Sequence, residues 1–171
     1  MTDAPPTQPL LDMLAPVTKT VASLDPSGAT DDAATAKLLR DLEEAWPFDG
    51  EAVQAIGNEI RRGVAEGWLC DRGEPDARFC RVAKATPDTQ DLSIDIVALS
   101  GAALRHTHPR GEVTMAFPAE PAPADAAGRF DGHAPGWVVM AAGSTHTPTV
   151  AGPRMHLLYF LPGGKVEWHP G

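Results

Sequence analysis

The chain has 171 residues, 43% of them hydrophobic, and its 23 acidic residues outnumber its 14 lysines and arginines to give a formal net charge of −9. This composition is typical of one globular domain with a substantial core and excludes disorder throughout. The negative charge repels phosphate backbones and excludes nucleic acid as an expected partner. Because no long apolar run and no basic-then-apolar leader are present, we expect a cytoplasmic protein that makes no membrane contact.

The first third of the chain predicts helices. Residues 1–9 carry three prolines and are interpreted as a flexible tail. Beyond this tail, apolar residues recur at helical spacing between residues that cap or break helices. The predicted helices cover roughly 8–24, with Pro16 disturbing the helix, then 31–45, capped by Thr30 or Asp31 and ended by Trp46-Pro47, and finally 49–66, capped by Asp49 and closed by Gly67.

From Trp68 onward the pattern changes to short β-like runs broken by Gly and Pro. Predicted strands cover 68–71, 78–84, 91–99, 102–108, 112–117, 136–141, 146–150 and 154–161, with a last one at 165–168. Residues 119–127 are rich in Ala, Pro and acidic residues and predict an exposed loop. The chain is therefore predicted to be α+β, with a tail and helical segment over 1–66 and an antiparallel β-barrel or jelly roll over 67–171.

One motif in the β-rich part points to a metal. The run His106-Thr-His108-Pro-Arg-Gly-Glu112 is followed at a distance by His146. Imidazole suits zinc, iron, nickel and copper, whereas carboxylate suits harder ions, so three His and one Glu favour a first-row divalent ion over calcium or magnesium. These four residues are the predicted ligands. A chance grouping of surface or core histidines is the alternative.

The spacing of this motif also predicts a turn. His106 and His108 are two apart and point to the same face of a strand. A straight strand would carry Glu112 about 20 Å from His106, too far to share an ion with bonds of about 2.0–2.2 Å. Because Pro109 fixes φ and Gly111 permits positive φ, the segment predicts a strand, a tight turn and a returning strand.

Cys70 and Cys80 are the chain's two cysteines. In a reducing compartment they are interpreted as free thiols in or near strands, with a disulfide as the weaker alternative. Two cysteines alone do not make a zinc site.

The chain resembles a cupin. Gly101, His106-Thr-His108 and Glu112 match the first cupin motif, although Ala119 stands where a later Gly is usual. Gly143 and His146 match the second motif, which here lacks its usual Pro. The four metal-binding residue types are thus all present, and the two departures concern turns.

A narrower resemblance is to the 4-hydroxylaminobenzoate lyase family. It rests on the metal-motif run and on later segments of the chain, and the helical segment before the barrel is also similar. The matching segments are His106–Glu112, Gly128–His133, Pro135–Val138, Gly143–His146, Pro148–Val150 and Leu158–Gly164. The resemblance implies conversion of 4-hydroxylaminobenzoate to 3,4-dihydroxybenzoate and ammonia in nitroaromatic degradation, with one divalent ion, Fe, Zn, Mn or Ni, acting as a Lewis acid.

Three residues have candidate catalytic roles beside such an ion. Glu112 is a ligand, or alternatively a general base that leaves the metal. His133 is a proton shuttle at the barrel mouth, or a surface residue of a loop. Tyr159 is an acid near the metal, or a core residue with a bonded hydroxyl.

An aromatic acid also needs a cation for its carboxylate. The candidate anchors are Arg78, Arg105, Arg129 and Arg154, in or beside the β-rich part. Arg78 is the preferred one, while Arg105 adjoins His106 and so points away from the metal. Met115 and Trp137 are the expected contacts of the substrate's ring, with Phe117 and Met140 as further candidates. Each of these apolar residues could instead belong to the core.

Two other functions use the same features. The ligand set also serves cupin dioxygenases and isomerases, which consumption of oxygen would separate from a lyase. A metal-sensing cupin regulator would leave a free apolar surface on its helices, whereas the helices of a lyase should pack on the barrel or on a second subunit. Barrels of this kind often pair through sheet edges, so a homodimer is expected.

Overall fold

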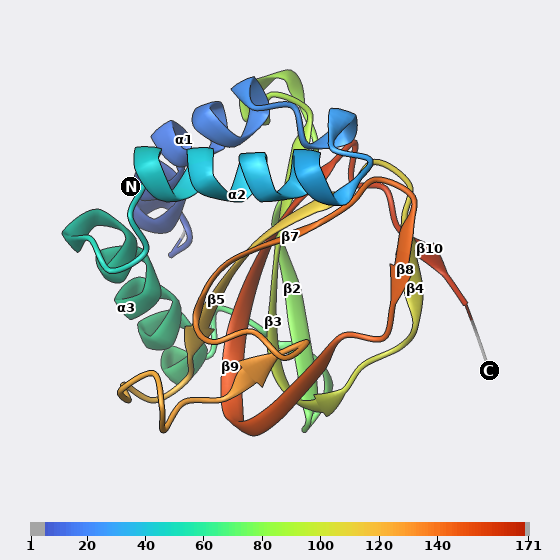
Figure 1. The fold of residues 1–171 in the computed structure, drawn as a ribbon. Helices are drawn as coiled ribbons and strands as arrows, with labels where there is room; N and C mark the ends of the chain where they lie inside the picture. The colour runs from blue at the N-terminus through green and yellow to red at the C-terminus, as the bar shows by residue number, and fades with distance from the viewer. Residues whose placement is uncertain (1–5, 170–171) are drawn as a thin grey trace.

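The computed structural model describes residues 6–169 as a layer of helices and two antiparallel sheets (Figure 1). The helices are α1 (Gln8–Ser23), α2 (Asp32–Ala45) and α3 (Glu51–Glu66), with 3-10 turns η1 (Pro26–Gly28) and η2 (Pro87–Thr89). The predicted α+β class is confirmed. None of the helices among the described residues is long and apolar enough to cross a membrane.

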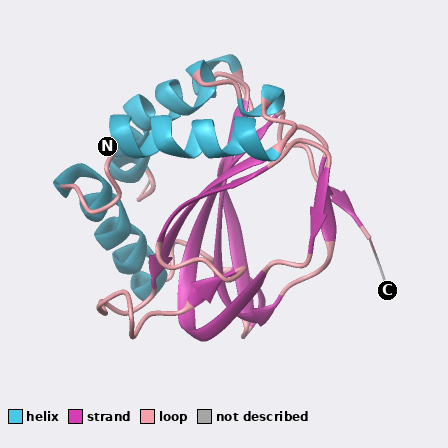
Figure 2. Cartoon of the chain, viewed as in Figure 1, coloured by secondary structure: helices cyan, strands magenta, loops and turns pink. Residues whose placement is uncertain are grey.

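The strands form two sheets of unequal size, which are consistent with a jelly-roll sandwich (Figure 2). The larger sheet has the order β1-β2-β3-β9-β5-β7, with β6 pairing β9, and the smaller has the order β10-β4-β8. The strands are β1 (Arg72–Glu74), β2 (Ala77–Ala83), β3 (Leu92–Ala102), β4 (His106–His108), β5 (Glu112–Pro118), β6 (Arg129–Phe130), β7 (Gly136–Met140), β8 (Ser144–His146), β9 (Thr149–Pro162) and β10 (Glu167–Trp168).

The helix boundaries follow local chemistry. The Asp31 carboxylate accepts a hydrogen bond from the Ala34 amide (2.8 Å) and caps α2 as predicted. Gly67 ends α3 with a left-handed φ of 85°, also as predicted. The N-cap of α3 is Gly50 and not Asp49. Pro16 does not interrupt α1, because it lies on the exposed side of the helix, where water can bond the carbonyl that the proline leaves unpaired.

The large sheet separates two cores. Val113, Met115 and Phe117 of β5 belong to the core between this sheet and the helices. Ala116 of the same strand belongs to the second core, which lies on the opposite face of the sheet. Alternation along β5 therefore puts Glu112 on the side of the small sheet, together with the second core. Figure 1 shows the helices and the small sheet on opposite sides of the large one.

Three strand predictions need correction. Residues 68–71 form a turn, because the amides of Trp68 and Leu69 bond back to the Gly63 carbonyl and Cys70 has a φ of 53°. The predicted strand 102–108 is divided between β3 and β4, and the predicted strand 146–150 is divided between β8 and β9. Both divisions occur where the chain passes from one sheet to the other.

The two cysteines are free and buried, as the sequence favoured. The neighbouring Cys80 thiol first, and burial next, raise the pKa of Cys70, whose thiol donates to the Ile96 carbonyl (3.6 Å). Cys70 itself lies in the turn after α3 and not in a strand.

Candidate metal centre

The three histidines of the motif lie on the small sheet and share one face. His106 and His108 are alternate residues of β4, so their side chains point the same way. His146 of β8 is the direct register partner of His106. Side chains of register partners lie on the same face of an antiparallel pair. Two neighbouring strands therefore direct three imidazoles toward one point.

Glu112 reaches this point from the large sheet. β4 ends at His108 and β5 begins at Glu112, so the predicted strand, turn and returning strand are confirmed. The turn is closed by a hydrogen bond from the Gly111 amide to the His108 carbonyl (3.2 Å). Gly111 has a φ of 83°, and a Cβ there would lie 3.1 Å from the Pro26 carbonyl oxygen, so both conformation and space favour glycine.

The four donor atoms are spaced for a single ion. The Nε2 atoms of the histidines are separated by 2.9 Å (His106–His108), 2.9 Å (His108–His146) and 3.2 Å (His106–His146). The Glu112 carboxylate is 2.8 Å from the His108 Nε2, and all four donors lie within 4.8 Å of one another. An ion with bonds of about 2.1 Å separates adjacent ligand atoms by about 3.0 Å in octahedral and about 3.4 Å in tetrahedral geometry.

The hydrogen bonds of the ring nitrogens also suit a metal. The Nδ1 of His106 donates to the Leu104 carbonyl (3.0 Å), and the Nδ1 of His146 donates to Asp131 (2.6 Å). Their Nε2 atoms therefore carry lone pairs, which face each other across the cluster formed by His106, His108, Glu112 and His146. Burial first, and the neighbouring His108 and His146 next, lower the pKa of His106 to about 4, so this imidazole is neutral at pH 7. Converging lone pairs beside a buried carboxylate fit a shared cation.

Asp131 is part of the site, although it was not among the residues predicted from the sequence. Its second carboxylate oxygen accepts the Thr149 amide (2.8 Å), which anchors the group behind His146. Asp131 has a φ of 48°, a conformation that Asn and Asp adopt more readily than most residues. An aspartate before a glycine, between the two histidine segments, was the one available signal.

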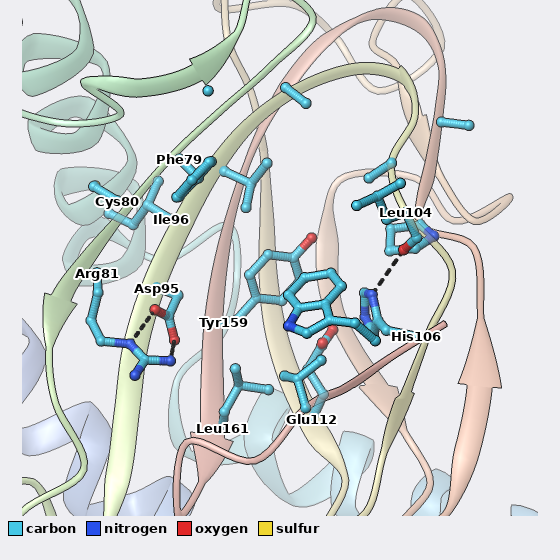
Figure 3. Close-up of a pocket in the computed structure, with 18 of the residues that line it drawn as sticks. Phe79, Cys80, Arg81, Asp95, Ile96, Leu104, His106, Glu112, Tyr159 and Leu161 are labelled. Atoms are coloured by element: carbon cyan, nitrogen blue, oxygen red, sulfur yellow. Dashed lines mark hydrogen bonds and ion pairs between the residues drawn. The ribbon is translucent and has the colours of Figure 1, made fainter. Parts of the chain in front are cut away.

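The cluster opens into a cavity of about 710 Å³ between the two sheets (Figure 3). This volume is within the range of small-molecule sites. His106, His108 and Glu112 contribute to its wall, together with Tyr159 and Trp168. The Trp168 ring lies edge-on to the His106 ring, with 5.0 Å between the ring centroids.

Tyr159 belongs to the second core and also lines the cavity, and its role as an acid near the metal stays a prediction. The hydrogen bonds of the described residues include none to its hydroxyl. Burial first, and the negative charge of Glu112 next, raise the pKa of Tyr159 well above its ordinary value. The phenol is therefore protonated at neutral pH and can donate a hydrogen bond or a proton into the cavity.

The other expected site residues lie elsewhere. Arg78 donates to the carbonyls of Cys70 (2.9 Å) and Gly73 (3.2 Å) and is not part of the cavity wall. Met115 and Trp137 are buried in the core on the helix side of the large sheet. The indole N–H of Trp137 donates to the Trp46 carbonyl (2.8 Å), which ties β7 to the end of α2.

His133 is also outside the cavity wall. Its side chain is exposed, and its backbone pairs with Phe130 in both directions (2.9 and 2.8 Å). The backbone of His133 therefore closes the turn that contains Asp131. Its imidazole makes no hydrogen bond to the metal-site residues in the described part of the chain.

Comparison with known proteins identifies the family of the chain. A family model described as PnbB, 4-hydroxylaminobenzoate lyase, matches residues 22–168 and so spans α2, α3, the four candidate metal ligands and the cavity. The chain belongs to the 4-hydroxylaminobenzoate lyase family. It is therefore a lyase, and the resemblance predicted from the sequence is confirmed.

Two relatives in this family carry the same name. A 4-hydroxylaminobenzoate lyase of Pseudomonas putida is 30% identical over 152 residues, which cover 81% of this chain and 86% of the relative. A 4-hydroxylaminobenzoate lyase of Nocardioides sp. (strain LMS-CY) is 26% identical over 133 residues, which cover 74% of this chain and 78% of the relative.

Proposed function

We propose that the chain converts 4-hydroxylaminobenzoate to 3,4-dihydroxybenzoate and ammonia, with one divalent metal ion held by His106, His108, Glu112 and His146. The observation that carries the proposal is the convergence of these four donor atoms, three of them from residues that line a cavity large enough for a small aromatic acid, in a member of this family. Iron, zinc, manganese and nickel all accept this donor set.

The reaction balances without an external oxidant. In the net reaction the substrate takes up one water, its N–O bond is broken, the ring gains hydroxyls at C3 and C4, and the nitrogen leaves C4 as ammonia. The N–O bond is itself the oxidant, so no redox cofactor is consumed. A bound divalent ion would supply Lewis acidity and lower the pKa of a bound water.

The protein's own groups have distinct tasks in this scheme. The Thr114 hydroxyl donates to one oxygen of Glu112 (2.5 Å), while the other oxygen is 2.8 Å from His108 Nε2. This division favours Glu112 as a ligand, because one oxygen is held away and the other faces the cluster. The protonated Tyr159 hydroxyl is the group we assign to protonate the departing oxygen.

The packing of the helices favours an enzyme over a regulator. The apolar faces of α1, α2 and α3 are buried in the core that they share with the large sheet. Leu39 is the one large hydrophobic residue that stays exposed on the described helices. A regulator that binds a partner through these helices would need a larger apolar surface.

The test is an assay of purified protein with 4-hydroxylaminobenzoate that measures ammonia, 3,4-dihydroxybenzoate and dissolved oxygen together. We expect ammonia and the dihydroxy acid in a 1:1 ratio with oxygen unchanged. Stoichiometric oxygen consumption would instead identify a cupin dioxygenase. Release of neither product by metal-loaded protein would refute the proposed function.

A further inference from the structure

We propose that Arg81 binds the carboxylate of the aromatic acid, so that the substrate lies across the large sheet with its hydroxylamine at the histidine cluster. The inference rests on the proposed function for the identity of the substrate. It assigns to Arg81 the role that the sequence favoured for Arg78.

The charge of the cavity wall makes such a cation necessary. Glu74, Asp76, Asp95 and Glu112 all contribute to the wall. Among the described residues, Arg81 is the one lysine or arginine that does so. A benzoate that enters an acidic cavity is repelled unless a cation meets its carboxylate. Arg81 is the available group, and a guanidinium forms charge-assisted hydrogen bonds with a carboxylate.

The guanidinium is held in place from behind. Its Nε donates to one oxygen of Asp95 (2.7 Å), and its Nη2 lies 3.5 Å from the other oxygen. Asp95 is fixed in turn by the Ser93 hydroxyl (2.8 Å). No hydrogen bond of the described residues involves Nη1, so this donor is available to a ligand. An arginine oriented in advance loses less side-chain entropy on binding.

The register of the large sheet sets the distance between the Arg81–Asp95 pair and the four candidate metal ligands. Arg81 pairs with Asp95, Asp95 with Tyr159, and Tyr159 with Thr114, the residue that bonds Glu112. With neighbouring strands about 4.8 Å apart, Asp95 and Thr114 are separated by about 10 Å. A benzene ring with substituents at opposite ends, plus one hydrogen bond at each end, has a comparable length.

The close-up shows the same order (Figure 3). The Arg81–Asp95 pair lies on one side of the cavity, Tyr159 in the middle, and His106 on the other side, with Glu112 between Tyr159 and His106. A substrate with its carboxylate at Arg81 would therefore extend past Tyr159 to the cluster. This orientation fits a para-substituted acid better than an ortho-substituted one, whose two groups are too close together to reach both ends.

Steady-state kinetics of Arg81→Met and Arg81→Lys test the assignment, with 4-hydroxylaminobenzoate and the uncharged N-phenylhydroxylamine as substrates. For Arg81→Met we expect KM for the acid to rise by about 10- to 100-fold with kcat little changed, the loss of one charge-assisted contact. Arg81→Lys should recover part of this loss. The kcat/KM for N-phenylhydroxylamine should be unchanged, which also shows that the variant is folded.

Arg62→Met is the matched control, because Arg62 forms a similar ion pair with Glu59 (2.6 Å) on α3, outside the cavity wall. It should leave both substrates unaffected. An unchanged KM for the acid in Arg81→Met overturns the inference. An equal loss for both substrates also overturns it, because that result indicates a structural role.

Binding of 4-aminobenzoate, measured by calorimetry, separates this inference from the proposed function. The wild type should bind this acid at least 10-fold more tightly than aniline, and Arg81→Met should remove the difference. If the wild type shows this preference but does not turn over the hydroxylamine, the proposed function fails and the role of Arg81 stands. A wild type that shows no preference for the acid overturns the role of Arg81.

Discussion

Asp131 fixes which nitrogen of His146 faces the cluster. Its 2.6 Å contact with Nδ1 places the ring proton there, so Nε2 is left as the donor to a metal. The Thr149 amide donates to the other carboxylate oxygen (2.8 Å), so both oxygens of Asp131 are hydrogen-bonded. Ring orientation and basicity of His146 therefore depend on a residue that touches no metal.

Replacing Asp131 by Asn should weaken metal affinity by about 10- to 100-fold, the usual cost of losing a carboxylate behind a histidine ligand. Competition with a chromogenic chelator measures this affinity directly, without reference to catalysis. Asp91→Asn is the matched control, because Asp91 also has a positive φ (62°) and pairs with Arg110 on the surface (3.1 Å). Equal metal affinity in all three proteins would show that Asp131 does not position His146.

At the residue scale, the site residues that could be predicted from the sequence are those whose spacing in the chain brings them together. His106, His108 and Glu112 are close in the chain, and the structure brings them together with His146. Met115 has the opposite strand parity to Glu112, so alternation alone could have placed it on the helix side. Choosing Arg81 over Arg78 requires knowing which face of β2 lines the cavity. The burial along β2 does not alternate regularly, and arginines occur on both faces, so the sequence does not indicate this face. Asp131 depends on a contact across 15 residues that no local pattern records.

At the scale of elements, β9 carries a buried histidine that faces the helices. His156 is 3% exposed, and its Nδ1 has no partner. Burial first, and the charges of Arg61 and Arg154 next, lower the pKa of His156 to about 4. The neutral ring is therefore tolerated in the folded protein, whereas protonation would place a charge between the sheet and α3.

This arrangement predicts an acid-sensitive contribution to stability. The unfolded chain protonates His156 near its ordinary pKa of 6.5, before the folded protein does, so stability is lost as pH falls from 6.5 to about 4. The full loss is roughly 3 kcal/mol. Urea unfolding of the wild type and His156→Leu across this pH window measures the loss. The contribution of the metal-site histidines is the same in both proteins and cancels in the difference. A difference between the two proteins that does not change with pH would contradict the prediction.

The elements themselves were predictable where their signals are long and regular. The three helices match their predicted ranges to within two residues, because apolar periodicity and caps agree. The strands of the small sheet were harder to predict from the sequence. They have two or three residues each, and in the sequence β4 and β8 form continuous β-like runs with the neighbouring strands β3 and β9 of the large sheet. β6, with two residues, was missed for the same reason.

At the scale of the whole molecule, the cluster joins the two sheets. Three imidazoles come from the small sheet and Glu112 from the large one, so a metal would link β4 and β8 to β5. The homodimer expected from the sequence stays a prediction, as does the cytoplasmic location.

A metal that binds only the folded protein should raise its thermal stability. Free metal at 100 times Kd adds about 2.7 kcal/mol to the free energy of unfolding. For a chain of this size, that corresponds to an increase in Tm of roughly 5–10 °C. Calorimetry before and after chelation measures the shift, with re-added metal as the control. A Tm that does not change after verified removal would show that the cluster does not link the sheets through an ion.

The most direct measurement is ammonia release from 4-hydroxylaminobenzoate by one preparation in three states: as purified, stripped of metal, and reconstituted. Metal content is determined by elemental analysis in each state. We predict one divalent ion per chain, loss of activity with the ion, and recovery with re-added metal. Full ammonia release by protein shown to be free of metal would contradict the assignment of His106, His108, Glu112 and His146 as a catalytic metal centre.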